Sequence, residues 1–272
     1  MASVTHAVAP TGQQLQSISG HGRLRGMGNM LANELRRWWG TRRWVVHLLL
    51  WIVLLNGLIL LIGLTAGSDP SETEPTLDQL IDAFLQVSAV ASGIGIVTVA
   101  QGVIVGEKQR GTAAWLLAKP ASRSAFVLAR LVAYAASFGG LALLLPATLF
   151  YGEAIFLTGQ APSPVGLLTG VGVLAVHLLF YLALTLMLGA FFNGRGPVAG
   201  VGVGMVVAGF IAPMLLPQSV LLATPWPLRS LAPGLALGGE LPAGWPIPLA
   251  ASALWATIFV GAALWRFGRE EF

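Results

Sequence analysis

Six long apolar segments recur along the chain, and shorter polar segments separate them. The apolar segments cover about residues 44–66, 84–106, 131–150, 165–192, 198–216 and 247–265. Each has 19 or more residues, and none contains Asp, Glu, Lys or Arg. As a helix, 19 residues cover about 28 Å, close to the ~30 Å hydrocarbon core of a bilayer. The pattern therefore predicts an all-α integral membrane protein with six transmembrane helices.

The polar segments between the predicted spans alternate in charge. Fourteen of the fifteen Lys and Arg residues lie on one side, and the other side carries only Arg229 together with seven of the eleven acids. Cytoplasmic loops of membrane proteins carry an excess of Lys and Arg. We therefore expect the basic side, with both termini, to be cytoplasmic. The acidic side is expected to consist of the loops 67–83, 151–164 and 217–246.

The composition supports one membrane domain. Hydrophobic residues make up 56% and charged residues 10%, whereas soluble domains carry about 25% charged residues. The absence of Cys excludes disulfides and Cys-based metal sites. The net charge of +4 does not indicate nucleic-acid binding, because the arginines lie at the ends of apolar spans. Residues 1–21 are small and polar without a signal-peptide core, which predicts a disordered cytoplasmic tail before a single domain, 22–272.

An amphipathic helix is expected before the first span. Five apolar residues fall within an arc of about 80° on a helix: Leu24, Met27, Leu31, Leu35 and Trp38. The opposite side carries Arg25, Asn29, Asn33, Arg36 and Arg37. Such a helix lies in the plane of the membrane, in contact with lipid. An ordinary cytosolic loop is the alternative.

The loop 217–246 is too long for a simple connection between two helices. Its central part is apolar and contains Pro225, Pro227 and Pro233. We expect short re-entrant or surface helices that these prolines interrupt, with an irregular lid as the alternative.

The loop after the second span predicts a short helix that must dock on another surface. Thr112 can cap its start, and Lys119 and Pro120 mark its end. About seven residues are too few for an isolated helix, which needs roughly 12–15. Trp115, Leu116 and Leu117 supply the apolar surface for docking. Ser122 or Ser124 can cap the helix that follows.

Two segments of the chain resemble a known family. Residues 106–112 read GEKQRGT, and residues 116–120 read LLAKP, followed by Arg123. The chain ends in WRFGREEF. This combination is similar to type-2 ABC transporter permeases, the membrane subunits of ATP-driven exporters, over roughly residues 25–272.

The resemblance implies that residues 107–120 form a coupling helix that contacts a separate cytosolic ATPase subunit. The positions that carry this role are Glu107, Lys108, Arg110, Gly111, Thr112, Trp115, Leu116, Leu117, Pro120 and Arg123. It also implies a second permease chain, identical or different, and a multi-pass location in a prokaryotic cell (inner) membrane. The alternative for the loop is a simple interfacial turn.

The chain itself has no nucleotide-binding motif. The sequence G-x-x-x-x-G-K-[ST] does not occur, so we expect no cofactor on this chain, with ATP and Mg bound by the ATPase. Glycines at four-residue spacing favour close helix packing rather than a nucleotide site, as at Gly166 and Gly170 or at Gly196, Gly200 and Gly204.

Few polar residues lie inside the predicted spans: His47, Asn56, Gln86, Gln101 and His177. His47 is expected at the membrane interface. His177 has no second ligand nearby, which favours an inter-helix hydrogen bond over metal or proton binding. Asn56, Gln86 and Gln101 either line a pathway or bond between helices, and the sequence leaves both open.

The sequence therefore favours a permease subunit that is not itself an enzyme, with ATP hydrolysis expected in a separate partner subunit, over three other classes of membrane protein. A secondary transporter usually needs ionisable groups within the membrane, and an intramembrane enzyme needs paired Asp, Ser with His, or a zinc motif. A non-transporting membrane anchor or assembly component stays open. The weakly polar spans are compatible with the transport of lipid-like, drug-like or amphipathic molecules. They are equally compatible with a narrow, closed interface between two permease chains.

Overall fold

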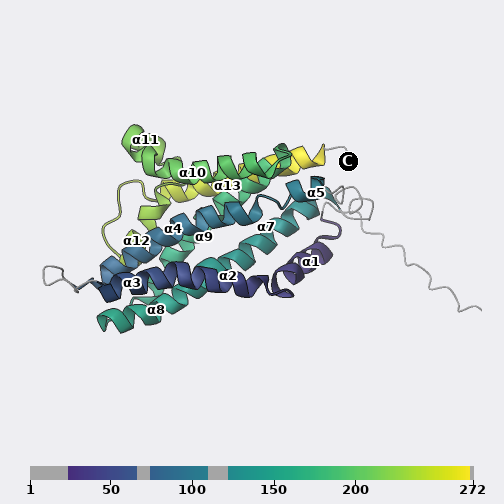
Figure 1. Cartoon of the computed structure of the whole chain (residues 1–272). Helices are drawn as coiled ribbons and strands as arrows, with labels where there is room; N and C mark the ends of the chain where they lie inside the picture. The colour runs from purple at the N-terminus through teal and green to yellow at the C-terminus, as the bar shows by residue number, and fades with distance from the viewer. Residues whose placement is uncertain (1–23, 66–73, 110–121, 270–272) are drawn as a thin grey trace, which may run out of the picture.

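A computed structural model describes residues 24–65, 74–109 and 122–269, and these residues form helices and turns without a strand. Six helical stretches are long and apolar enough to cross a membrane: Arg43–Thr65, Leu77–Gln109, Arg123–Thr158, Pro164–Phe191, Arg195–Leu215 and Pro246–Gly268. They run roughly side by side as an elongated bundle (Figure 1). The six predicted spans and the all-helical class are confirmed.

The first three spans contain more than one element each. The first is α2 (Arg43–Trp51), the π-helix η1 (Ile52–Asn56) and α3 (Gly57–Thr65). The second joins α4 (Leu77–Ala100) to α5 (Val105–Gln109). The third is α7 (Arg123–Gly139), the π-helix η2 (Gly140–Leu144) and α8 (Leu145–Thr158).

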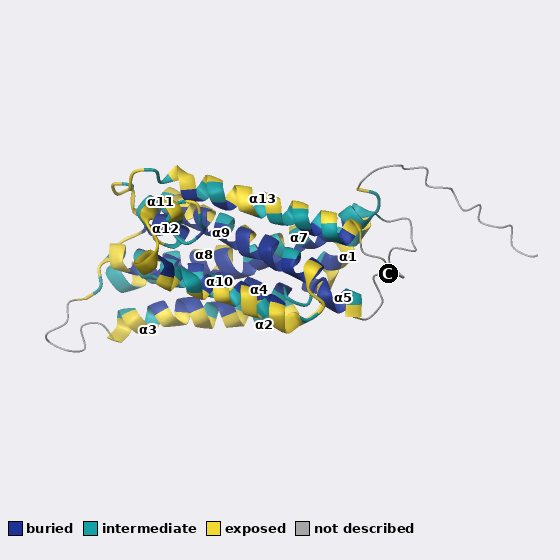
Figure 2. Cartoon of the chain, turned by 90° about the horizontal axis from the view of Figure 1, so that it is seen from above, coloured by how far each residue is buried: buried dark blue, intermediate teal, exposed yellow. Residues whose placement is uncertain are grey.

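The remaining spans are single helices: α9 (Pro164–Phe191), α10 (Arg195–Leu215) and α13 (Pro246–Gly268). Helix α9 lies at the centre and packs against α4, α7, α10, α12 and α13. Its residues are mostly buried, whereas the first span, α10 and α13 expose most of theirs (Figure 2). Apolar side chains on these outer helices face the surroundings, as expected of helices in lipid.

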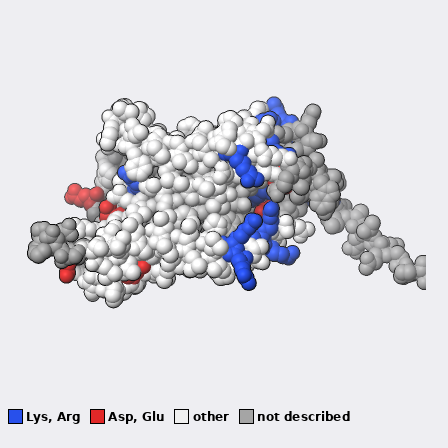
Figure 3. Space-filling model, viewed as in Figure 1, with Lys and Arg blue, Asp and Glu red and all other residues white. Residues whose placement is uncertain are grey.

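The two ends of the bundle differ in charge (Figure 3). The basic end contains α1 (Met27–Trp39), α5, the start of α7 and the last turns of α9 and α13. The acidic end contains the ends of α3 and α8 and the connection between α10 and α13. Lys and Arg gather at the first end, and most of the visible Asp and Glu lie at the second.

Helix bounds at the acidic end differ from those expected. Helix α4 begins at Leu77, so Asp78 and Asp82 are helical rather than part of a loop, because Thr76 and Gln79 form a capping box. Helix α8 continues to Thr158, so Glu153 is helical too. Asn56 donates a hydrogen bond to the Glu153 carboxylate, which allows this acid to lie within the helix.

The segment between α10 and α13 contains α11 (Gln218–Leu221) and α12 (Leu228–Leu237). The expectation that Pro233 interrupts a helix is wrong, because Pro233 lies inside α12 and is buried. Contacts with α4 and α9 stabilise this helix. Gly166 and Gly170 of α9 make the close approach possible, because a side chain at either would meet a backbone carbonyl oxygen of α12.

Candidate functional site

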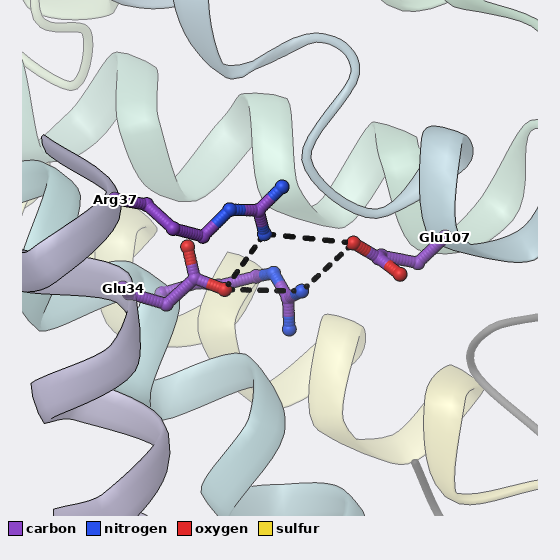
Figure 4. A network of polar contacts seen from close by, with 4 residues as sticks. Glu34, Arg37 and Glu107 are labelled. Atoms are coloured by element: carbon purple, nitrogen blue, oxygen red, sulfur yellow. Dashed lines mark hydrogen bonds and ion pairs between the residues drawn. The ribbon is translucent and has the colours of Figure 1, made fainter. Parts of the chain in front are cut away.

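An ion-pair cluster joins three elements at the basic end (Figure 4). Glu34 and Arg37 come from α1, Glu107 from α5 and Arg130 from α7. The Arg130 guanidinium lies 3.2 Å from the Glu34 carboxylate and 3.4 Å from the Glu107 carboxylate. Arg37 lies 3.4 Å from Glu34 and 3.7 Å from Glu107. Each arginine therefore bridges the same two acids.

The cluster is electrically balanced but unevenly buried. The side chains of Arg130, Glu34 and Glu107 are 6%, 9% and 8% exposed, whereas that of Arg37 is 48% exposed. Buried charges are costly unless they are paired. Arg130 is thus the central cation, since it is the buried partner of both buried carboxylates.

Aromatic packing extends the cluster towards α13. The guanidinium carbon of Arg130 lies 3.6 Å from the centre of the Phe126 ring. The Phe126 ring in turn stacks on Phe267 of α13 at 4.9 Å. Both phenylalanines are fully buried. These contacts fix the guanidinium in orientation and connect α7 to the last turn of α13.

The segment that leads into residues 110–121 is anchored by side chains of α5. Lys108 Nζ donates to the carbonyl of Ala190 in the last turn of α9, at 3.1 Å. Gln109 Nε2 donates to the carbonyl of Asn193 in the α9–α10 turn, at 2.8 Å. The carbonyls of a last helical turn lack intrahelical partners and favour a cation. This side of the loop is therefore attached to the end of the central helix.

The segment that leaves residues 110–121 is anchored as well. The backbone N–H of Ser122 donates to the carbonyl of Arg25, just before α1, at 3.0 Å. Arg123 donates to the carbonyl of Gly268, the last residue of α13, at 2.7 Å. The Ser122 hydroxyl accepts from the N–H of Ala125 and caps α7, which confirms one of the two predicted caps. We call Glu107, Lys108, Gln109, Ser122 and Arg123 the loop anchors.

A sequence model of the family described as ABC-2 family transporter protein matches residues 29–272, from within α1 to the end of the chain. The chain belongs to the ABC-2 transporter family. Members of this family are membrane components of transport systems and generally work with a cytosolic ATPase. No curated protein matches the chain.

The coupling residues implied by the resemblance fall into two groups in this ABC-2 chain. Glu107, Lys108 and Arg123 are loop anchors, and all three contact other elements of their own chain. The others lie outside the described residues: Arg110, Gly111, Thr112, Trp115, Leu116, Leu117 and Pro120. Glu107 is buried, so its carboxylate faces Arg130 and Arg37 rather than an exposed surface.

The amphipathic helix forms as α1, and its predicted apolar side faces the protein. Trp38 is buried, Met27, Leu31 and Leu35 are half-buried, and Leu24, just before the helix, is exposed. Arg36 and Arg37 lie on the outer side. Sequence reasoning missed Glu34, which shares the buried side. Glu34 lies three residues after Leu31 and four before Trp38, and this spacing places it on the same side of the helix as those apolar residues.

The polar residues inside the spans are used in different ways. Asn56 bonds between helices, because its Nδ2 donates to the Pro146 carbonyl and to Glu153. Gln86 bonds to Asp82 and Gln101 to the Thr98 carbonyl, each within its own helical stretch. His177 is buried in α9 beside Tyr181, at 4.9 Å between ring centres. Its Nδ1 has no hydrogen-bond partner in the described part of the chain.

Proposed function

We propose that this chain is the membrane permease subunit of an ATP-binding-cassette exporter. In this proposal a separate cytosolic ATPase docks on residues 110–121. The loop anchors carry the proposal, because they tie both sides of that segment to α1, α7, α9 and α13. A displacement of the segment would thus reach four elements of the bundle at once.

The charge distribution supports the orientation that docking requires. Lys and Arg concentrate at the end that contains the loop anchors (Figure 3). Because cytoplasmic segments of membrane proteins are enriched in these residues, the basic end faces the cytoplasm in the proposal. An ATPase in the cytosol then reaches residues 110–121 directly, and ATP and Mg bind to that subunit.

The ion-pair cluster gives the anchors a way to transmit motion. Glu107 links α5 to α7 through Arg130 and to α1 through Arg37. Lys108 attaches the same short helix to α9, the most buried span. When ATP binding closes the ATPase pair, α5 moves with the loop and pulls on these elements. The buried pairs resist separation, so the spans move together.

A second permease chain completes the proposed exporter. Most residues of the first span and of α10 are exposed or half-buried, whereas most residues of α9 are buried. Both expose large apolar side chains, such as Val53 and Met214. Such faces suit either lipid or a second permease, and a pair of ATPases requires two docking loops.

The docking part of the proposal is tested by purifying the tagged chain from its native membranes and identifying co-purifying proteins by mass spectrometry. The ATPase should accompany the wild-type chain and should be lost from a Leu116→Asp, Leu117→Asp variant. Arg42→Gln is the matched control, because Arg42 is exposed at the basic end but lies outside the loop. Retention of the ATPase by the loop variant would refute docking at this segment.

The transmission part needs a different variant and a different readout. The chain has no Cys, so one introduced Cys can carry a probe at the acidic end, for example at Val165, which is 76% exposed. ATP with vanadate should change the probe signal in the wild-type complex. Glu107→Gln, which weakens the contacts with Arg130 and Arg37, should keep the ATPase bound and reduce the change. An unchanged response would show that Glu107 does not transmit motion, and no response even in the wild type would favour a non-transporting anchor.

A further inference from the structure

A polar pocket of about 120 Å³ lies at the basic end between α1, α2, α4 and α7. Its polar lining consists of Glu34, Arg37, Arg43, His47 and Tyr134. A single water molecule needs only about 10–15 Å³, so this pocket has room for a group of several atoms. Three larger hollows in the described part of the chain are lined mainly by apolar side chains, and this pocket differs from them in chemistry.

The hydrogen-bond donors of this pocket are not all satisfied by the described residues. Arg43 forms no ion pair with an acid among the described residues. His47 lies one helical turn after Arg43, and its Nδ1 is buried without a hydrogen-bond partner in that part of the chain. The single acid, Glu34, is already engaged by Arg130 and Arg37. The pocket thus keeps a positive balance and open hydrogen-bonding capacity, which favours an anion.

Aromatic rings hold these donors in place. The Trp38 ring lies 5.2 Å from the His47 ring and 5.2 Å from the Tyr134 ring, and Trp38 is buried. Nearby, Trp39 and Trp44 contact each other at 6.1 Å across the turn from α1 to α2. Tryptophans are enriched at the level of the lipid headgroups. The pocket therefore lies where a headgroup phosphate would be in a bilayer.

An apolar groove begins beside the pocket and follows the first span. It has a volume of about 750 Å³ and is lined from Val46 to Leu61. Val46 and Leu50 are exposed, and they follow Arg43 by three and seven residues, which places all three on one face of α2. A molecule with a phosphate in the pocket can thus lay an acyl chain along this groove.

We propose that this pocket binds the phosphate of an anionic phospholipid of the cytoplasmic leaflet. Arg43 and His47 contact the phosphate, Tyr134 and Arg37 complete the site, and the acyl chains follow α2 and α3. Basic pockets between helices on the cytoplasmic side suit anionic headgroups. The inference rests on the proposed function only for the orientation of the basic end, and it needs no ATPase. A bound phosphate would also touch Arg37, the cation that pairs with Glu107.

The test measures lipid binding to the purified full chain in neutral detergent by native mass spectrometry. Phosphatidylglycerol should bind saturably at one high-affinity site and more tightly than phosphatidylcholine with the same acyl chains. Arg43→Gln should weaken phosphatidylglycerol binding about fivefold to tenfold. His47→Phe, which keeps an aromatic ring beside Trp38, should weaken it as well. Arg42→Gln removes the same charge one residue away, outside the pocket, and should bind as the wild type does.

Two results would overturn the proposal, provided that circular dichroism shows folded variants. Equal losses in Arg43→Gln and Arg42→Gln would mean that lipid responds to charge near the membrane rather than to this pocket. Displacement of the lipid by excess inorganic phosphate would mean that the pocket recognises free phosphate instead. Neither result depends on ATPase docking, so each is distinct from a failure of the proposed function.

Discussion

Replacing Arg130 with Met should destabilise the protein more than any other single change in the ion-pair cluster. The guanidinium is 6% exposed and lies within 3.4 Å of both Glu34 and Glu107. Its loss leaves two buried carboxylates with one partner, Arg37, which is half exposed. Removing one member of a buried pair costs about 3–5 kcal/mol. We expect the free energy of unfolding to fall by about that amount.

The other members of the cluster should matter less, in a defined order. In Glu107→Gln, Arg130 keeps Glu34 at 3.2 Å and can still donate to the amide oxygen, so the loss is about 1 kcal/mol. In Arg37→Gln the lost side chain is 48% exposed and the contacts are 3.4 and 3.7 Å long. Pairs of this kind contribute about 0–1 kcal/mol.

Unfolding in mixed detergent micelles, followed by circular dichroism, measures these differences. The reasoning also predicts a rescue, because the penalty arises from unpaired carboxylates. Adding Glu34→Gln and Glu107→Gln to Arg130→Met should restore part of the stability. Equal destabilisation by Arg130→Met and Arg37→Gln, or no rescue, would refute the view that Arg130 is the central cation.

Three further predictions concern packing, hydrogen bonding and orientation. Gly166→Ala should lower stability by about 1–3 kcal/mol, because the new Cβ overlaps the α12 backbone, while Gly172→Ala, with nothing within 4 Å, should be neutral or slightly stabilising in the same unfolding assay. Asn56→Leu should cost about 0.6–2 kcal/mol through its two lost inter-helix bonds, and no loss would show that these bonds are dispensable. In intact cells, an impermeant maleimide should label Glu240→Cys but label Arg42→Cys only after lysis; the reverse pattern would invert the proposed orientation.

The number of spans could be predicted because each is a long run without charge, and this property is visible residue by residue. The first and last residues of the helices were harder to predict, because a helix can extend beyond the apolar run that marks its membrane span. Thr76 and Gln79 form a capping box that begins α4 ahead of its apolar run. Their three-residue spacing is typical of such a cap, but hydropathy alone does not detect it. Glu153 lies inside α8, and its carboxylate accepts a hydrogen bond from Asn56, 97 residues away. No local pattern contains that information.

The ion-pair cluster could be predicted only in fragments. Glu107 stood out through the GEKQRGT segment, but Arg130 looked like one more basic residue at the cytoplasmic end of a span. Glu34 and Arg130 lie 96 positions apart in the sequence, and α1 packing on α7 brings them to 3.2 Å. Such a pairing depends on tertiary packing, which neither charge counts nor helical periodicity specifies.

The positions of Glu107 and Lys108 change how the family resemblance is interpreted. The resemblance implied that residues 107–120 contact the ATPase as one unit. In the structure, Glu107 is buried against Arg130, and Lys108 binds a carbonyl at the end of α9. Their side chains hold the loop to the bundle, so they suit transmission of motion rather than recognition of a partner. In the proposed function, recognition falls to residues 110–121, whose sequence includes the apolar Trp115, Leu116 and Leu117. Binding and coupling should therefore separate on mutation, with anchor variants losing only coupling and loop variants losing both.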